Sequence, residues 1–279
     1  MVTYGRVEWV IDSFASYKSP GVDSIFLAML QKGWEVVIPY LDRIFRACLA
    51  TGYVPAIWRQ VKVVFIPNPG RNSYSRPRDY RPISLILFLL RTMERLVHRY
   101  LRDEALALVP LHPNQHAYRA GKSVETVVDQ LVVLVEKALD QQETVLCVFL
   151  DIERAFNNTC YNTMCDVLVK HSSEYTMVGW IRATLEGRMA VGTLGVLYLM
   201  LAMSRGYPQG GVLSPLLWCL VVDDLLAKLS GSVDFIQGYA DDMSSRGGKI
   251  PKHGIRTHAM GPFNCRDMVQ RGQTVGQSC

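Results

Sequence analysis

The sequence has no paired cysteine motif and no long apolar run. Its seven cysteines are an odd number, and none of them forms a Cys-x-x-Cys pair. That pattern argues against a disulfide scaffold and favours a reducing compartment. The most apolar stretch, residues 191–203, is too short to span a bilayer. No signal peptide opens the chain and no repeats recur along it, so we expect an intracellular protein of nucleus or cytoplasm with no membrane partner.

The composition is that of a globular protein with an uneven charge. Hydrophobic residues make up 49% and charged residues 20% of the 279 residues, enough for one large domain or two modest ones. The net charge is +5, yet residues 59–102 alone hold ten Lys and Arg against two acidic residues. This basic segment suits a polyanion such as nucleic acid. A solvated helix face with basic loops explains the same charges equally well.

Hydrophobic patterns predict alternating helices and strands. We expect a turn and then a helix within residues 13–30, a helix over 36–52 with Gly52 as its C-cap, and a strand over 61–67. A helix is expected over 84–106, and its Arg91-to-Arg102 face either follows a template backbone or is a plain exposed face. The apolar run Thr144–Asp151 predicts a strand buried on both faces. Further helices are expected over 157–171 and 214–229, the latter with Ser214 as N-cap, before a last strand at 233–240.

Three acidic residues follow two predicted strands that are rich in apolar residues. Asp151 ends one strand, and Asp241 and Asp242 directly follow the other in "GYADD". If the strands are neighbours, the carboxylates meet and repel one another, and Mg²⁺ relieves that repulsion through oxygen ligands. A pair of such ions, about 3.5–4 Å apart, supports in-line phosphoryl displacement. The alternative is a surface turn without metal, just as Asp223 and Asp224 within a predicted helix indicate an ordinary solvated face.

Several motifs occur together in one order over roughly residues 11–243. They read "YKSPGVDSI", "VVFIPNPGR", "DYRPISL", "NQHAYRAGKSVET", "FLDIERAF", "RGYPQGGVLSPLLW" and "YADD". This series resembles the reverse transcriptases of retrotransposons that lack long terminal repeats. The resemblance implies an α/β (α+β) right-hand polymerase fold and RNA-directed DNA polymerase activity. A fingers region would occupy residues 1–143, and a palm with an antiparallel sheet backed by helices would occupy residues 144–243.

The resemblance also implies a set of functional residues and partners. Asp151, Asp241 and Asp242, with the Ile152 carbonyl, would hold two Mg²⁺ ions or Mn²⁺ in their place. Partners would be an RNA template, a DNA primer and deoxynucleoside triphosphates. Phe156 would exclude a ribonucleotide's 2′-hydroxyl. Without the resemblance, Phe156 is an ordinary helix core residue. Gln209 and Gly210 either approach the nucleotide together with Ile152 or form a plain loop before the next helix. Arg81 is either a phosphate ligand or a solvated loop charge, and Arg71 would compensate in part for the missing lysine described below.

Two departures from the family pattern stand out. Asn68 replaces a lysine in "IPNPGR", which predicts weaker nucleotide binding. After the paired acids the family continues with an apolar strand, whereas this chain reads "MSSRGGKIPKHG", which favours strand formation poorly. We therefore expect a tail over residues 244–279 that is disordered or non-native, no thumb, and a chain truncated after "YADD". The alternative function is an inactive remnant that only binds nucleic acid.

Overall fold

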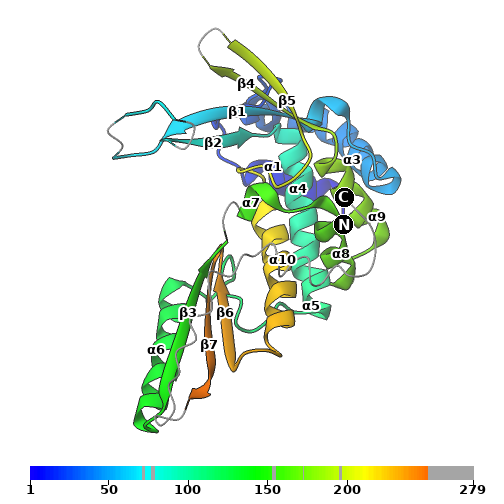
Figure 1. Ribbon diagram of the computed structural model, residues 1–279. Coiled ribbons are helices and arrows are strands. Elements are labelled where there is room, and N and C mark those ends of the chain that lie inside the picture. The colour runs from blue at the N-terminus through cyan, green and yellow to red at the C-terminus, as the bar shows by residue number, and fades with distance from the viewer. Residues whose placement is uncertain (71–72, 77–78, 153–154, 172, 195–196, 251–279) are drawn as a thin grey trace.

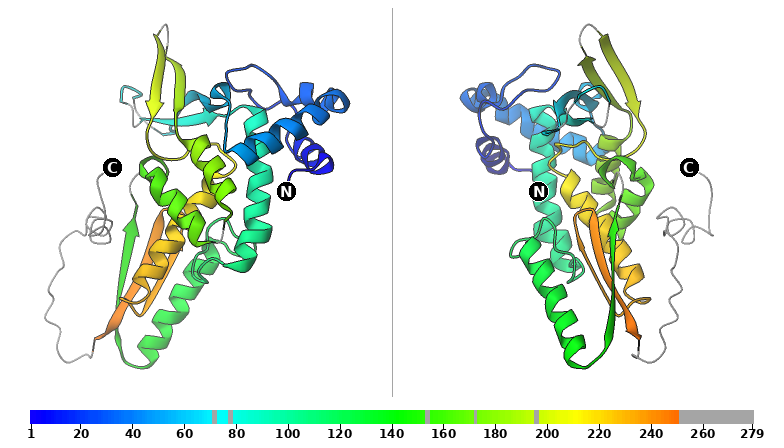
Figure 2. Two further views of the ribbon diagram at one scale, coloured as in Figure 1. Left: turned by 90° about the vertical axis from the view of Figure 1, so that its right-hand side faces the viewer. Right: turned by 60° about the vertical axis from the view of Figure 1, so that its left-hand side comes forward.

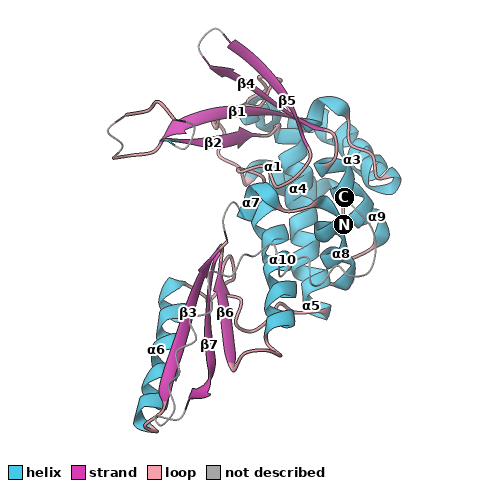
Figure 3. Ribbon diagram, viewed as in Figure 1, coloured by secondary structure: helices cyan, strands magenta, loops and turns pink. Residues whose placement is uncertain are grey.

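The chain forms two β-sheets beside a body of helices (Figure 1). The computed structural model describes residues 1–70, 73–76, 79–152, 155–171, 173–194 and 197–250. Figure 3 shows the sheets as separate groups of strands, one at each end of the view. None of the helices in these described ranges is both long and apolar enough to cross a membrane.

The N-terminal helices pack on one another through apolar side chains. Gly52 ends the third helix in the left-handed conformation, with φ 61°, which confirms its prediction as C-cap. The helix expected within residues 13–30 is wrong in extent, because only its last part and two further residues are helical. A first helix, which the sequence patterns did not predict, precedes it. The bounds are α1 (Tyr4–Asp12), α2 (Leu27–Lys32) and α3 (Trp34–Thr51).

The four-stranded sheet has the order β2-β1-β4-β5. Its strands are β1 (Gln60–Pro67), β2 (Tyr80–Leu85), β4 (Arg188–Leu194) and β5 (Leu197–Met203), and a short 3₁₀ helix, η1 (Ala56–Arg59), leads into β1. β1 pairs antiparallel with β2 and parallel with β4, while β4 and β5 form an antiparallel hairpin. The helix predicted from residue 84 begins only at Phe88, because the residues before it pair with β1 as β2.

A helical body joins the two sheets and contains most of the buried core. It comprises α4 (Phe88–Tyr100), the π-helical turn η3 (Leu101–Ala105), α5 (Leu106–Leu108), α7 (Ala155–Asn158), α8 (Tyr161–Lys170), α9 (Tyr175–Leu185) and α10 (Ser214–Leu229). Trp180, Phe88 and Met93 are among its largest fully buried side chains. Ser214 is not the N-cap of α10. Leu213 holds that position, and the Ser214 hydroxyl instead donates to the Pro208 carbonyl.

The three-stranded sheet lies between two helices (Figure 1 and the right view of Figure 2). It consists of β3 (Thr144–Asp151), β6 (Phe235–Tyr239) and β7 (Asp242–Ile250), antiparallel throughout and in the order β3-β7-β6. Gln237 donates to a carbonyl of α6 (Val124–Asp140), whereas a Cβ at Gly238 would touch Val222 and Leu226 of α10. Because successive residues of a strand face opposite sides, α6 and α10 cover opposite faces.

The prediction of a structureless segment after Met243 is wrong for residues 244–250. These residues belong to β7, which lies between β3 and β6, so the two strands expected as neighbours are both paired to it. Met243 is buried, and Ser244 accepts a hydrogen bond from the buried Gln237. Pairing on both sides thus overrides the low strand propensity of Ser, Gly and Arg. Residues 251–279 of the expected tail lie outside the described residues.

Burial on both faces is also wrong for β3. The side chains of Leu146, Val148 and Phe149 are exposed, Phe149 to 70%. β3 is an edge strand of its sheet, and α10 contacts β6 at the opposite edge. The apolar run therefore predicted a strand correctly, but the prediction that both faces of this strand are buried is wrong for this chain.

Candidate active site

The three acidic residues meet at one end of the three-stranded sheet. Asp151, the last residue of β3, lies opposite Asp242, the first residue of β7, and Tyr239 of β6 lies opposite Asp242 from the other side. Residues on one rung of a sheet project from the same face. Asp241 occupies the turn between β6 and β7, and its carbonyl accepts a hydrogen bond from the Ile152 backbone N–H at 2.9 Å. The structure thus brings Asp151, Ile152, Asp241 and Asp242 together.

The chemistry of these side chains suits a hard divalent cation. Asp151, Asp241 and Asp242 are exposed, and no described Lys or Arg forms an ion pair with any of them. Carboxylate oxygens free of a protein cation are the ligands that Mg²⁺ prefers. Within the described residues, no three His, Cys, Asp or Glu side chains lie close enough together to form a complete metal site. Two facing carboxylates and a third in the adjoining turn fit such an ion in donor type.

The turn that carries Asp241 is held at both of its central carbonyls. Ala240 has φ 54°, a left-handed conformation that is uncommon for a residue with a Cβ. The Trp218 indole N–H of α10 donates to the Ala240 carbonyl at 2.9 Å, and Ile152 donates to the next carbonyl, that of Asp241. These two hydrogen bonds stabilise a strained turn in the place where the acids lie.

Phe156 lies in an aromatic cluster next to this turn. Its ring centroid is 5.8 Å from that of Trp218 and 6.2 Å from that of Tyr207, the latter contact being edge-on. The Tyr207 N–H donates to the Phe156 carbonyl at 2.7 Å. Gly206, with φ 74°, permits this approach, because a Cβ there would lie 2.6 Å from the Phe156 carbonyl oxygen. Phe156 is therefore fixed through both its backbone and its ring.

The loop with Gln209 and Gly210 is attached to the end of β2. The Ser84 N–H donates to the Gln209 carbonyl at 2.7 Å. Gly210 has φ 121°, and a Cβ there would lie 2.5 Å from the Ser84 carbonyl oxygen. Only glycine fits both the conformation and the space. The "DYRPISL" and "PQGG" segments, which are far apart in the sequence, thus form one backbone unit.

Two buried charged residues anchor the ends of that loop. Glu94 of α4 accepts a hydrogen bond from the Val212 N–H at 2.7 Å, and Arg188 donates to the Gly206 carbonyl. Burial raises the pKa of Glu94 to about 7, although the backbone N–H of Val212 and the nearby Arg91 and Arg188 act in the opposite direction. Sequence patterns missed both residues, because each reads as an ordinary charge in an amphipathic segment.

The basic residues of this region form two groups: Arg71 and Arg81 precede α4, whereas Arg95 and Arg99 lie within it. Arg81 is exposed on β2 and forms no ion pair with the three acids in the described part of the chain, whereas Arg71 lies outside the described residues. Arg95 and Arg99 lie over the rings of Phe14 and Trp9 of the N-terminal segment, at 4.0 and 4.8 Å from the ring centroids. These two side chains therefore join α4 to the N-terminal segment. The sequence predicted either a template contact or a plain exposed face here, and neither prediction included this role.

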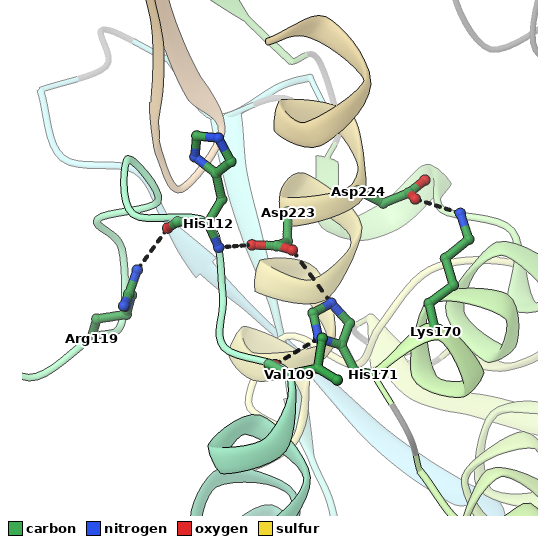
Figure 4. Close-up of polar contacts among 7 residues, drawn as sticks. All are labelled: Val109, His112, Arg119, Lys170, His171, Asp223 and Asp224. Atoms are coloured by element: carbon green, nitrogen blue, oxygen red, sulfur yellow. Dashed lines mark hydrogen bonds and ion pairs between the residues drawn. The ribbon is translucent and has the colours of Figure 1, made fainter. Parts of the chain in front are cut away.

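The prediction that Asp223 belongs to a solvated helix face is wrong. It is buried, accepts a hydrogen bond from the His112 backbone N–H, and lies 3.4 Å from the Nε2 atom of His171 (Figure 4). The hydrogen bond to Asp223 raises the pKa of His171, whose Nδ1 atom lies 3.1 Å from the Val109 carbonyl oxygen. Asp224 is partly exposed and pairs with Lys170 and Lys228.

This buried network supports the strand that leads to the acids. The segment that Asp223 anchors continues along the free edge of β6, where Asn114 and His116 exchange backbone hydrogen bonds with Gly238. Two residues further on, Tyr118 is exposed with φ 55°. Desolvation raises the pKa of Tyr118, and the charges of Cys219, Asp241 and Tyr239 add to that shift. Tyr118 thus follows the segment that pairs with Gly238 of β6, a placement that no sequence pattern indicated.

The fold resembles that of solved telomerase structures. Its arrangement resembles that of apo telomerase from Candida tropicalis truncated from the C-terminal domain, with a TM-score of 0.54 and 13% identity over 75% of this chain and 48% of that chain. Telomerase from the same organism in complex with a fragment of telomeric RNA gives a TM-score of 0.53 with 12% identity, over 78% of this chain and 40% of that chain. At this identity the likeness concerns the fold alone.

Residues 66–245 match the family described as reverse transcriptase (RNA-dependent DNA polymerase). The chain belongs to this family. It is 31% identical over 224 residues to a probable RNA-directed DNA polymerase from transposon BS of Drosophila melanogaster, which covers 79% of this chain. It is 30% identical over 227 residues to a Pol polyprotein from the type-1 retrotransposable element R1 of Bradysia coprophila, which covers 81% of this chain. The chain spans only 24% and 22% of these two relatives.

Family membership and fold confirm the predictions of a reverse transcriptase domain and of an α/β polymerase fold. Reverse transcriptases use divalent metal ions and bind a nucleic-acid template and primer as a family property. The individual residue roles implied by the motifs stay predictions, and so do the boundaries of the fingers and palm.

Proposed function

We propose that this chain is the fingers and palm portion of an RNA-directed DNA polymerase of a mobile element without long terminal repeats. It would extend the 3′ end of a DNA primer on an RNA template, with deoxynucleoside triphosphates as substrates. The observation that supports this function best is the rung shared by Asp151 and Asp242, with Asp241 in the adjoining turn. Family membership over residues 66–245 supports the same reaction.

Asp151, Asp241 and Asp242 would hold two Mg²⁺ ions, with the Ile152 carbonyl as a further oxygen ligand. Bound there, the ions would activate the primer hydroxyl and stabilise charge on the leaving pyrophosphate. The protein's own contribution is placement. The hydrogen bond from Ile152 to the Asp241 carbonyl and the β3–β7 pairing hold the carboxylates at one end of the sheet. Such fixed placement favours catalysis, since small displacements of reacting groups lower the rate strongly.

The remaining residues would bind and select the nucleotide. Phe156, which packs against Trp218 and Tyr207, would clash with a 2′-hydroxyl and so select deoxynucleotides. Gln209 and Gly210, attached to β2, would contact the nucleotide or the template through the backbone and the side-chain amide. Arg81, exposed on β2, and Arg71 would pair with phosphate oxygens.

Primer extension tests this proposal. The chain is incubated with an RNA template, an annealed DNA primer, Mg²⁺ and deoxynucleoside triphosphates, and primer length is followed on a gel. We expect extension by the wild type, and its loss in Asp151→Asn and in Asp241→Asn. Asp224→Asn serves as the control, because Asp224 lies on α10, where its own ion partners are Lys170 and Lys228.

The same variants separate activity from binding alone. Salt-sensitive binding of the primer–template duplex that does not change in Asp241→Asn, with no extension by the wild type, would indicate a remnant that only binds nucleic acid. Extension that survives both Asp→Asn changes would exclude the proposed carboxylates.

A further inference from the structure

Trp218 of α10 contacts both parts of the site that the proposed function needs. Its indole N–H donates to the Ala240 carbonyl at 2.9 Å, and its ring lies 5.8 Å from the ring of Phe156. The side chain is almost fully buried. Trp218 thus lies between the turn that carries Asp241 and the aromatic residue assigned to sugar selection.

The hydrogen bond to Ala240 acts directly on the position of Asp241. The Ala240 carbonyl belongs to the peptide group that links Ala240 to Asp241, so its direction sets where the next Cα atom lies. Ala240 has φ 54°, a conformation that a residue with a Cβ adopts only at an energetic cost. Without a partner for this carbonyl, the turn is free to relax. The Ile152 N–H, which donates to the Asp241 carbonyl, would lose part of its protection as well.

The ring of Trp218 acts on Phe156 independently of its N–H. The Trp218 and Phe156 rings are tilted by 37° to each other, and the Tyr207 ring packs edge-on against the Phe156 ring. The backbone of Phe156 is fixed separately, because its carbonyl accepts from the Tyr207 N–H at 2.7 Å. An aromatic ring at position 218 therefore holds the Phe156 ring in place, even if residue 218 has no N–H donor.

We infer that Trp218 is a positioning residue that couples the selection of the sugar at Phe156 to the placement of Asp241. Its N–H sets the turn and its ring sets the sugar-selecting side chain. This inference rests on the proposed function for its catalytic meaning, but the coupling itself is a property of the folded chain. The two contributions separate in two variants: Trp218→Phe removes the N–H and keeps a ring, whereas Trp218→Leu removes both.

Hydrogen–deuterium exchange of the 279-residue chain tests the coupling without any need for activity. We expect Trp218→Phe to speed exchange of the Ile152 amide about tenfold, as loss of one hydrogen bond predicts, and to leave the Tyr207 amide unchanged. Trp218→Leu should speed exchange at both amides. Trp180→Phe is the matched control, because Trp180 is fully buried on α9 and its indole N–H has no hydrogen-bond partner in the described part of the chain. It should change neither amide.

Nucleotide incorporation gives the second measurement. Trp218→Phe should lower kcat by roughly tenfold and keep the preference for deoxynucleotides over ribonucleotides within about twofold of the wild type, while Trp218→Leu should lower both. If the wild type extends no primer, the proposed function fails for this chain, and exchange at the two amides still decides the coupling. The inference is overturned if Trp218→Phe leaves Ile152 protected, or if it exposes Tyr207 as strongly as Ile152.

Discussion

Asp151 and Asp242 lie directly opposite each other across β3 and β7, so each of these strands contributes one carboxylate to the same rung of the sheet. Tyr239 of β6 completes that rung on the other side. The arrangement depends on β7, because β3 and β6 do not pair with each other. The segment that looks least like a strand is therefore the one that brings the acids together.

Removal of the Phe156 ring should relax the choice of sugar. Phe156→Val leaves space where the ring stood, so we expect the preference for deoxynucleotides over ribonucleotides to fall by about tenfold or more, with a smaller change in deoxynucleotide incorporation. Competing incorporation of dGTP and GTP measures this ratio. Phe26→Val, a change at a partly exposed phenylalanine that precedes α2, is the control and should leave the ratio unchanged. An unaltered ratio in Phe156→Val would remove Phe156 from sugar selection.

Two buried groups predict a fold that loses stability as pH rises. Burial raises the pKa of Glu94 from 4.5 to about 7, so the folded state binds a proton more tightly than the unfolded chain between these values. The hydrogen bond to Asp223 raises the pKa of His171 above 6.5. The folded state therefore also loses stability as the pH rises above 6.5. The Glu94 contribution lost between pH 4.5 and 7 is about 3 kcal/mol.

Urea unfolding at pH 5, 6, 7 and 8 measures this dependence. Glu94→Gln should flatten the slope between pH 5 and 7, because the amide keeps an acceptor for the Val212 N–H without the ionisable group. His171→Gln should flatten the part above pH 6.5. A slope that stays the same in Glu94→Gln would mean that Glu94 is already ionised in the folded protein at pH 5.

A methyl group at Gly210 should detach the loop from β2. Gly210→Ala introduces a Cβ that would lie 2.5 Å from the Ser84 carbonyl oxygen, at a φ of 121° that alanine avoids. We expect a loss of about 2 kcal/mol or more in the free energy of unfolding, together with weaker nucleotide binding. Gly231→Ala is the matched control, since nothing lies within 4 Å of a Cβ there. Equal stability of the two variants would contradict the close contact between this loop and β2.

Sequence patterns predicted those parts of the fold that depend on local signals. Gly52 ends its helix because a left-handed C-cap favours glycine, and the apolar runs before Asp151 and Asp241 form strands as expected. These features follow from backbone preference and from hydrophobic runs within a few residues. The three acids were predicted to lie together because they follow two of these strands.

What the sequence did not reveal depends on contacts between distant segments. The strand at residues 242–250 forms because β3 and β6 pair with it from both sides. Asp223 looks like one half of a solvated acidic pair, yet a loop more than a hundred residues earlier in the chain covers it and donates to it. Trp218 reads as an ordinary core residue of α10, and its role depends on Ala240 in the turn beside it. No periodicity reports such partners.

Residues 242–250 form the strand that places Asp151 beside the acid-bearing turn, and one cross-link tests this pairing. Native Cys147 of β3 lies opposite Arg246 of β7, at a spacing that allows a disulfide. Under mild oxidation, Arg246→Cys should form a bond between the introduced thiol and Cys147, seen as linked peptides by mass spectrometry and absent in a Cys147→Ser background. Ser245→Cys, whose side chain projects from the opposite face, should not form it. Efficient linkage by Ser245→Cys, or none by Arg246→Cys, would contradict the pairing register of β3 and β7.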